Sequence, residues 1–115
     1  LVLAIEYADR RILLTGDLES PGLDDLVAEP PHDCDVLLAP HHGGRRSNTP
    51  ALARWCSPEW VVVSGDDRNR TFANLKSTYE AEGAQVLSTA ELGAITTEIG
   101  PKGVHATGYL ANQRR

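Results

Sequence analysis

The sequence is poor in several residue types that often mark a function. It has no methionine, one phenylalanine and three tyrosines, so its core has to be built mainly from leucine, valine, alanine and isoleucine. No apolar run approaches the roughly 20 residues that a membrane-spanning helix needs. Its two cysteines, Cys34 and Cys56, have no CxxC spacing, which argues against a zinc knuckle or a redox motif and favours buried thiols.

Positive charge is also scarce. The 115 residues carry a formal net charge of −5, which argues against a general nucleic-acid-coating protein, because polyanion binding depends on clustered lysine and arginine. Acidic residues crowd the segment 19–35, whereas five arginines fall further along, at Arg45, Arg46, Arg54, Arg68 and Arg70. A local basic rim on an acidic domain is compatible with this distribution. The chain length fits one domain with a modest core.

Hydrophobic periodicity predicts alternating strands and helices. Strands are expected over residues 1–7, 11–15, 35–39, 60–64, 84–89 and 93–99, with a further strand over 104–109. Helices are expected to begin at Ser20-Pro21 and at Thr49-Pro50, because a hydroxyl followed by proline is a good helix start, and a third helix begins near Phe72. This order predicts a layered α/β domain. Because the sequence opens directly on a strand, we expect it to be a piece of a longer chain.

Two strand ends carry the residues with the clearest chemical potential. Thr15-Gly16-Asp17 follows one apolar strand, and Pro40-His41-His42-Gly43 follows the next. In open α/β sheets ligands bind at this edge, and glycine allows a sharp turn close to a ligand. The Asp17 carboxylate can bridge two divalent ions, and a neutral imidazole is a common zinc ligand. Because neighbouring strand residues point to opposite sides, we expect only one of the two histidines to bind metal and the other to contact substrate or a ligand residue.

Each of these features also has a plainer explanation. Gly16-Asp17 is a common turn, and a His-His pair is more often solvated or part of a core than a ligand. The plainer explanation of Arg45-Arg46 is a solvated loop, and that of Asp66-Asp67 is an Asx turn. His32 and His105 are expected to be structural.

Several segments together resemble one family. They are LLTGDLE at 13–19, DVLLAPHHG at 35–43, SNTPAL at 47–52, WVVVS at 60–64, EGAQV at 82–86 and LGAIT at 92–96. In these segments the chain resembles the C-terminal half of the metallo-β-lactamase-fold domain of ComEC-type DNA internalisation (competence) proteins. The resemblance implies an α/β fold that is half of a layered αββα metallo-β-lactamase domain, with a mixed sheet flanked by helices. Residues 1–111 would form this partial domain and 112–115 a polar tail.

The same resemblance implies a metal-dependent hydrolase acting on phosphodiesters during DNA uptake in natural competence. It matches Asp17 and His42 to metal ligands and His41 to a catalytic residue that faces the substrate. Asn69 matches the remnant of an asparagine-rich stretch, and we expect it to bind substrate together with Arg45 of the basic rim. The complete domain would hold two divalent ions, zinc or manganese, with DNA as the partner. The parent would be an integral cell-membrane protein of a bacterium, while the sequence itself indicates no compartment.

The chain departs from the family pattern in three places. The motif His-x-His-x-Asp-His, which supplies most of the metal ligands, belongs to the family's N-terminal half and is absent from this sequence. Gly44 stands where the family has serine, and the loop 65–72 that follows Ser64 has no histidine, whereas the family has Gly-His-Pro there. We therefore expect this chain alone to bind metal weakly or not at all and to be catalytically silent.

Two other functions stay open. A metal-free half-domain that serves structure or interaction would expose a sheet face normally covered by the missing N-terminal half, which favours self-association or strand pairing. A hydrolase of the same fold could also act on another substrate, such as a phosphorylcholine ester or a lactone, because fold does not fix chemistry.

Overall fold

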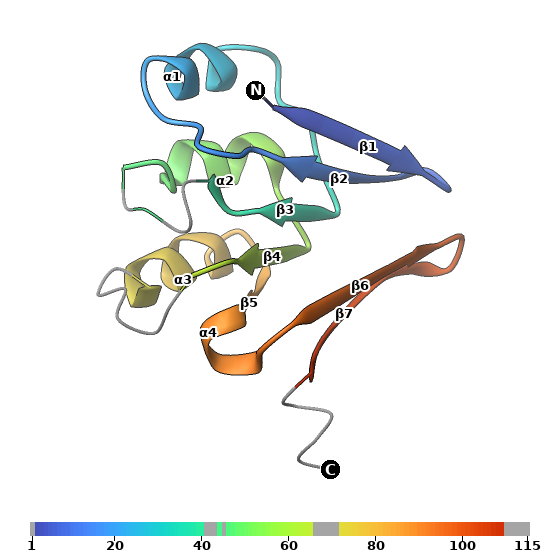
Figure 1. The fold of residues 1–115 in the computed structure, drawn as a ribbon. Helices are drawn as coiled ribbons and strands as arrows, with labels where there is room; N and C mark the ends of the chain where they lie inside the picture. The colour runs from blue at the N-terminus through green and yellow to red at the C-terminus, as the bar shows by residue number, and fades with distance from the viewer. Residues whose placement is uncertain (1, 41–43, 45, 66–71, 110–115) are drawn as a thin grey trace.

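The structure, a computed structural model, describes residues 2–40, 44, 46–65 and 72–109 (Figure 1). Its main sheet has five strands, whose order in space is the same as their order along the chain. They are β1 (Leu3–Tyr7), β2 (Arg10–Leu14), β3 (Val36–Leu38), β4 (Trp60–Val63) and β5 (Gln85–Ser88). The first two strands form an antiparallel hairpin, and β2 to β5 run parallel, so the sheet is mixed.

The helices and a second hairpin lie on opposite faces of this sheet. Three helices connect the parallel strands and pack on one face: α1 (Gly22–Val27), α2 (Pro50–Cys56) and α3 (Phe72–Glu80). A short helix, α4 (Thr89–Leu92), leads to a separate two-stranded sheet of β6 (Ile95–Gly100) and β7 (Gly103–Gly108). Figure 1 shows this hairpin apart from the three helices, across the sheet from them. The predicted α/β class, with a mixed sheet and flanking helices, is confirmed.

The larger core lies between the sheet and the helices. Leu13, Leu37 and Val61 are neighbours in the strand register and are all buried. They pack with Leu52 of α2 and Tyr79 of α3, which are fully buried. The apolar sides of these two helices therefore face the sheet, and their burial is the main hydrophobic contribution to the fold.

A smaller core lies on the other face. Val36 and Trp60 are buried there against Val104 and Ala106 of β7. The indole N–H of Trp60 donates to the Val104 carbonyl oxygen at 3.3 Å. The central strands β3 and β4 are thus covered on both faces, which explains why the run before Ala39 is continuously apolar.

One of the two predicted helix caps is present. Thr49 is the N-cap of α2, where its hydroxyl oxygen accepts the Leu52 N–H at 3.2 Å and Pro50 occupies the first turn. The prediction that Ser20 caps α1 is wrong, because α1 begins at Gly22 with Pro21 in the N-cap position and no side-chain cap bond. The Leu23 N–H donates instead to the backbone carbonyl oxygen of Glu19 at 3.0 Å, so a backbone group takes the place of the side-chain cap.

Helix α4 was not predicted, and it shortens the strand expected over 84–89. The strand ends at Ser88, whose hydroxyl oxygen accepts the Ala90 N–H at 3.1 Å and so starts a helical turn. The two cysteines are buried and free, as predicted. A hydrogen bond to Cys56 and burial raise the pKa of the Cys34 thiol well above its ordinary value. The predicted tail 112–115 lies outside the described residues.

Strand β1 lies at an edge of the sheet and exposes large apolar side chains. Leu3, Ile5 and Tyr7 are 50%, 48% and 65% exposed. By register they lie on the same face as Ile12, the face that the β6–β7 hairpin covers further along the sheet. Among the described residues, no helix is both long and apolar enough to span a membrane.

Candidate functional site

The ends of β2 and β3 are joined at the edge where the sequence predicts a site. Leu14 is paired with Leu38 in the parallel register. One residue beyond, the fully buried Thr15 donates its hydroxyl to the Leu38 carbonyl oxygen at 2.7 Å. This bond holds together the two chain segments that lead to Asp17 and to Pro40.

Asp17 lies on an exposed turn just past this bond. The turn closes through the Leu18 N–H, which donates to the Thr15 carbonyl oxygen at 3.1 Å, and Gly16 has a positive φ of 55°. Within the described part of the chain, the Asp17 carboxylate has no hydrogen bond or ion pair. Its oxygens are thus available to a hard or borderline cation, and the chemistry of this donor fits the predicted metal.

The remaining predicted site residues cannot be placed beside Asp17. His41, His42, Arg45 and Asn69 lie outside the described residues, as do Asp66 and Asp67. Along the sequence His41 follows Leu38 by three positions, the same offset as Asp17 from Leu14. Over residues 2–40, 44, 46–65 and 72–109, no group of three or more His, Cys, Asp or Glu side chains could hold a metal ion. The described residues supply one carboxylate of the predicted site.

A buried asparagine that the sequence reasoning did not single out lies next to this edge. Asn48 is 6% exposed, and its Nδ2 donates to the carbonyl oxygens of Pro40 at 3.0 Å and of Gly44 at 2.8 Å. Its Oδ1 accepts the hydroxyl of Tyr79 on α3 at 2.6 Å. Burial raises the pKa of Tyr79 well above its ordinary value, so the hydroxyl stays protonated and donates. The only sequence signal was an asparagine beside the Thr49 cap.

The two histidines expected to be structural both contact tryptophan rings. His32 stacks on Trp55 with ring centroids 6.3 Å apart, and His105 meets Trp60 edge-on at 5.9 Å. The first tryptophan is also held by its indole N–H, which donates to the Glu29 carbonyl oxygen at 3.0 Å. Each histidine thus lies against a buried tryptophan of one of the two cores.

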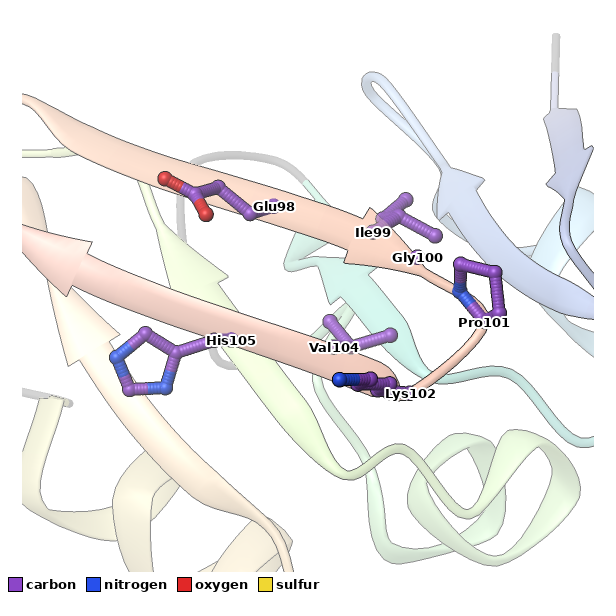
Figure 2. A pocket seen from close by; sticks show the side chains of 8 residues that line it. Glu98, Ile99, Gly100, Pro101, Lys102, Val104 and His105 are labelled. Atoms are coloured by element: carbon purple, nitrogen blue, oxygen red, sulfur yellow. The ribbon is translucent and has the colours of Figure 1, made fainter.

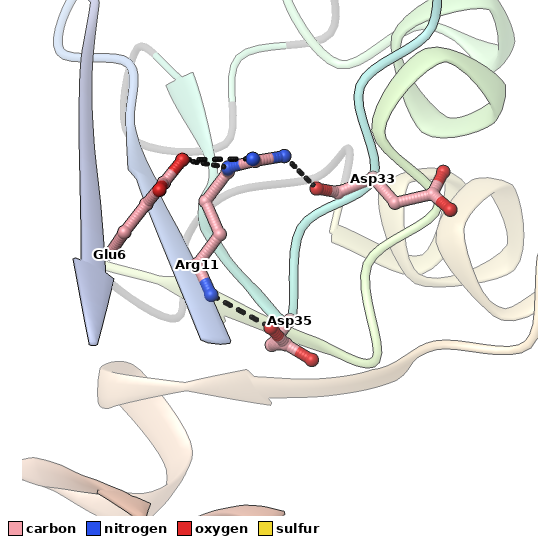
Figure 3. Close-up of polar contacts among 4 residues, drawn as sticks. All are labelled: Glu6, Arg11, Asp33 and Asp35. Atoms are coloured by element: carbon pink, nitrogen blue, oxygen red, sulfur yellow. Dashed lines mark hydrogen bonds and ion pairs between the residues drawn. The ribbon is translucent and has the colours of Figure 1, made fainter. Parts of the chain in front are cut away.

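A polar cluster surrounds Arg11, at the opposite end of β2 from Asp17 (Figure 3). The Arg11 guanidinium donates to Glu6 Oε1 at 2.8 and 3.0 Å and to the Asp33 carbonyl oxygen at 2.7 Å. Its backbone N–H donates to Asp35 Oδ2 at 2.8 Å. The cluster ties the first hairpin to the segment before β3, and because Glu6 is exposed its ion pair with Arg11 adds little to stability.

An open groove at the tip of the β6–β7 hairpin contains none of the predicted site residues (Figure 2). Figure 2 shows Glu98 and Ile99 on β6, Val104 and His105 on β7, and Lys102 in the turn. Glu98 and His105 are exposed cross-strand neighbours. The groove thus lies on the covering hairpin, away from the parallel-strand ends.

Neither protein-family models nor curated proteins give a match to this chain.

Proposed function

We propose that this chain is part of a metal-dependent hydrolase domain of the metallo-β-lactamase type, similar to the C-terminal half of the ComEC-type domain. In this proposal it contributes Asp17 and His42 to a two-metal site that hydrolyses DNA phosphodiesters during DNA uptake. The observation that supports it most is that Asp17 and Pro40 follow neighbouring parallel strands, whose ends are joined by the Thr15–Leu38 hydrogen bond. Ligand sites of open α/β sheets lie at this edge.

The residue roles follow from side-chain chemistry. Asp17 is exposed and its carboxylate is not engaged by other described residues, so its two oxygens can bridge two ions. His42 offers a neutral imidazole nitrogen, and His41, its neighbour, faces the substrate. Arg45 and Asn69 contact the phosphodiester by charge and by hydrogen bonding. Zinc or manganese ions supply activation of water and neutralisation of developing phosphate charge.

The remaining metal ligands would come from the N-terminal half-domain of the family. That half-domain would be the structural partner of this chain. The motif His-x-His-x-Asp-His would provide it. The parent would be an integral membrane protein of a bacterium, and this chain would meet the membrane only through that parent. On its own, the chain is expected to be catalytically silent.

The test compares Asp17→Ala with a matched control. In the full-length protein that contains this chain, hydrolysis of DNA with zinc or manganese is lost in Asp17→Ala and kept in Asp25→Ala, an exposed aspartate on α1. Bound metal measured by elemental analysis falls in the first variant only. Equal activity and equal metal content in wild type and Asp17→Ala would refute the site.

A second candidate, a non-catalytic interaction half-domain, is favoured by the exposed apolar side chains of β1. Leu3, Ile5 and Tyr7 form an apolar row on an edge strand, which is a surface that other chains or domains can cover. Sedimentation at several concentrations tests it. Association that weakens in Ile5→Lys favours this function, and a strict monomer counts against it.

A further inference from the structure

Cys34 and Cys56 lie 22 positions apart in the sequence, and the fold brings them together in the larger core. Cys34 belongs to the segment before β3, and Cys56 is the last residue of α2. The backbone N–H of Cys34 donates to the Cys56 carbonyl oxygen at 2.8 Å, and just before it the His32 N–H donates to the Trp55 carbonyl oxygen at 2.9 Å. Two backbone bonds therefore hold the segment before β3 along the C-terminal end of α2.

The two thiols are neighbours as well. The Cys56 thiol donates to the Leu52 carbonyl oxygen within α2 at 3.2 Å, which fixes the position of its sulfur. The Cys34 thiol donates to the Cys56 sulfur, and this hydrogen bond together with burial raises the pKa of Cys34 well above its ordinary value. Both cysteines are free. Their sulfur atoms thus lie within hydrogen-bonding distance of each other without being bonded.

This arrangement is close to the geometry of a disulfide. Strand residues joined by backbone hydrogen bonds have Cα atoms about 5.5 Å apart, within the range of about 4.4–6.8 Å that disulfides span. Sulfur atoms that already form a hydrogen bond have to approach by only about 2 Å to reach the S–S bond length of about 2 Å. A rotation of the Cys34 side chain gives a movement of this size, so the backbone bond between the two cysteines can stay in place.

A small oxidant can reach one of the two cysteines. Cys34 is 5% exposed and, together with Arg10 and Asp35, lines an open polar groove of about 380 Å³, whereas Cys56 is fully buried. A water molecule takes up about 30 Å³, so the groove admits a molecule as small as hydrogen peroxide. Because the pKa of Cys34 is raised, little of its thiolate is present at neutral pH, and we expect its oxidation to be slow.

We propose that Cys34 and Cys56 form an oxidation site, at which a peroxide converts the two thiols into an intramolecular disulfide. The Cys34 thiolate attacks one oxygen of hydrogen peroxide, the O–O bond breaks, and the hydroxide that leaves takes up the thiol proton as water, so that Cys34 becomes a sulfenic acid. The Cys56 sulfur then attacks the Cys34 sulfur, and the S–O bond breaks as the hydroxyl leaves with the Cys56 proton. Two thiols and one peroxide give one disulfide and two waters.

The disulfide would tie the N-terminal end of β3 to the C-terminal end of α2. These ends lie away from the sheet edge that carries Asp17, because the chain leaves β3 toward Pro40 at its other end. The oxidation site is thus independent of the proposed function, and either can fail without the other. In the unfolded chain the bond would close a loop and restrict the unfolded state, so we expect oxidation to raise the urea midpoint by about 1 M.

The experiment treats the full-length protein that contains this chain with excess hydrogen peroxide for several hours. Free thiols are then blocked with N-ethylmaleimide in denaturant, and the protein is digested with trypsin. Trypsin cleaves after arginine, so it places the two cysteines in separate peptides, 12–45 and 55–68. Mass spectrometry should find these two peptides linked, with two hydrogens fewer than their sum, and dithiothreitol should separate them. Cys56→Ser, which keeps the shape of the side chain, should give no linked peptide and should leave Cys34 as a sulfenic or sulfinic acid.

The urea midpoint is the second measurement. It should rise in oxidised wild type, return after reduction with dithiothreitol, and stay unchanged by peroxide in Cys56→Ser. If both cysteines of peroxide-treated wild type carry N-ethylmaleimide, or if Cys34 is oxidised without a linked peptide, the pair is not an oxidation site of this kind and the proposal is overturned. A disulfide that forms but lowers the midpoint would also overturn it, because the two sulfurs would then meet only by straining the core. The linked peptides are measured in wild type, so this test does not depend on the folding of a variant.

Discussion

Replacing Thr15 by valine removes one hydroxyl from the sheet edge that carries the candidate site. The side chain is fully buried, and the hydroxyl donates to the Leu38 carbonyl oxygen at 2.7 Å. The lost hydrogen bond costs about 0.5–1.5 kcal/mol, and an acceptor left without this partner adds about 1 kcal/mol. The new methyl group returns up to about 0.8 kcal/mol. We therefore expect Thr15→Val to lower the free energy of unfolding by roughly 1–2 kcal/mol.

Urea unfolding measures this loss directly. With a slope of about 2 kcal/mol per molar urea, the middle of the usual range, the midpoint should fall by roughly 0.5–1 M, without a change in slope. In a thermal melt the same loss lowers Tm by several degrees, about 5 °C. Thr15→Ser serves as the control, because it keeps the hydroxyl and loses only a buried methyl group. A Thr15→Val protein whose midpoint equals or exceeds that of wild type would show that the bond does not hold the two strands together.

Three further outcomes follow from the structure. Thr49→Ala should lose about 1 kcal/mol of unfolding free energy in urea titrations because it removes the α2 cap, whereas Ser20→Ala should be close to neutral because Ser20 makes no cap bond. Gly108→Ala should cost about 1–3 kcal/mol by driving a methyl group into a neighbouring leucine, whereas the same change at Gly100, which has open space around it, should cost little in a thermal melt. Because burial raises the pKa of Tyr79 above its unfolded value of about 10, its contribution to stability is complete below that pH and is lost as pH rises above it, so Tyr79→Phe should flatten the alkaline fall in urea midpoint.

Each of these outcomes can fail in a specific way. Equal losses in the two cap variants would mean that the hydroxyl of Thr49 does not stabilise α2. Equal melting temperatures in Gly108→Ala and Gly100→Ala would mean that the β6–β7 hairpin shifts to accommodate the added methyl group at Gly108. If the urea midpoint of Tyr79→Phe falls with rising pH as steeply as that of wild type, another group causes the pH dependence. The Cys34 thiol, whose pKa is also raised, would then be tested by Cys34→Ser.

The parts of the fold that the sequence predicts well are those with a repeated local signal. The apolar runs before Thr15 and Ala39 are long enough to define β2 and β3, and the stripe that includes Leu52 repeats at helical spacing. Thr49-Pro50 predicts the start of α2 because the hydroxyl, the proline and the capped N–H are within a few residues of each other. Such signals need no knowledge of the rest of the chain.

The parts that the sequence did not predict depend on competition or on distant partners. Ser20 has the right side chain for a cap, but a nearby backbone carbonyl satisfies the helix instead. Helix α4 spans four residues, too few to show a period. Asn48 bonds to Pro40, 8 residues away in the sequence, and to Tyr79, 31 residues away. No local sequence pattern therefore contains these bonds. Of the predicted site residues, only Asp17 lies among the described ones, and its role stays a prediction.

The identical order of the strands along the chain and across the sheet has a consequence for how the protein folds. Each parallel pairing joins residues 24 or 25 positions apart, as from Leu14 to Leu38 and from Val62 to Leu87. The chain entropy lost on closing each of these loops is therefore nearly the same. Each parallel strand pairs with the strand that precedes it in the sequence. Synthesis from the N-terminus can add one strand and its helix at a time, with the β6–β7 hairpin closing over the finished sheet last.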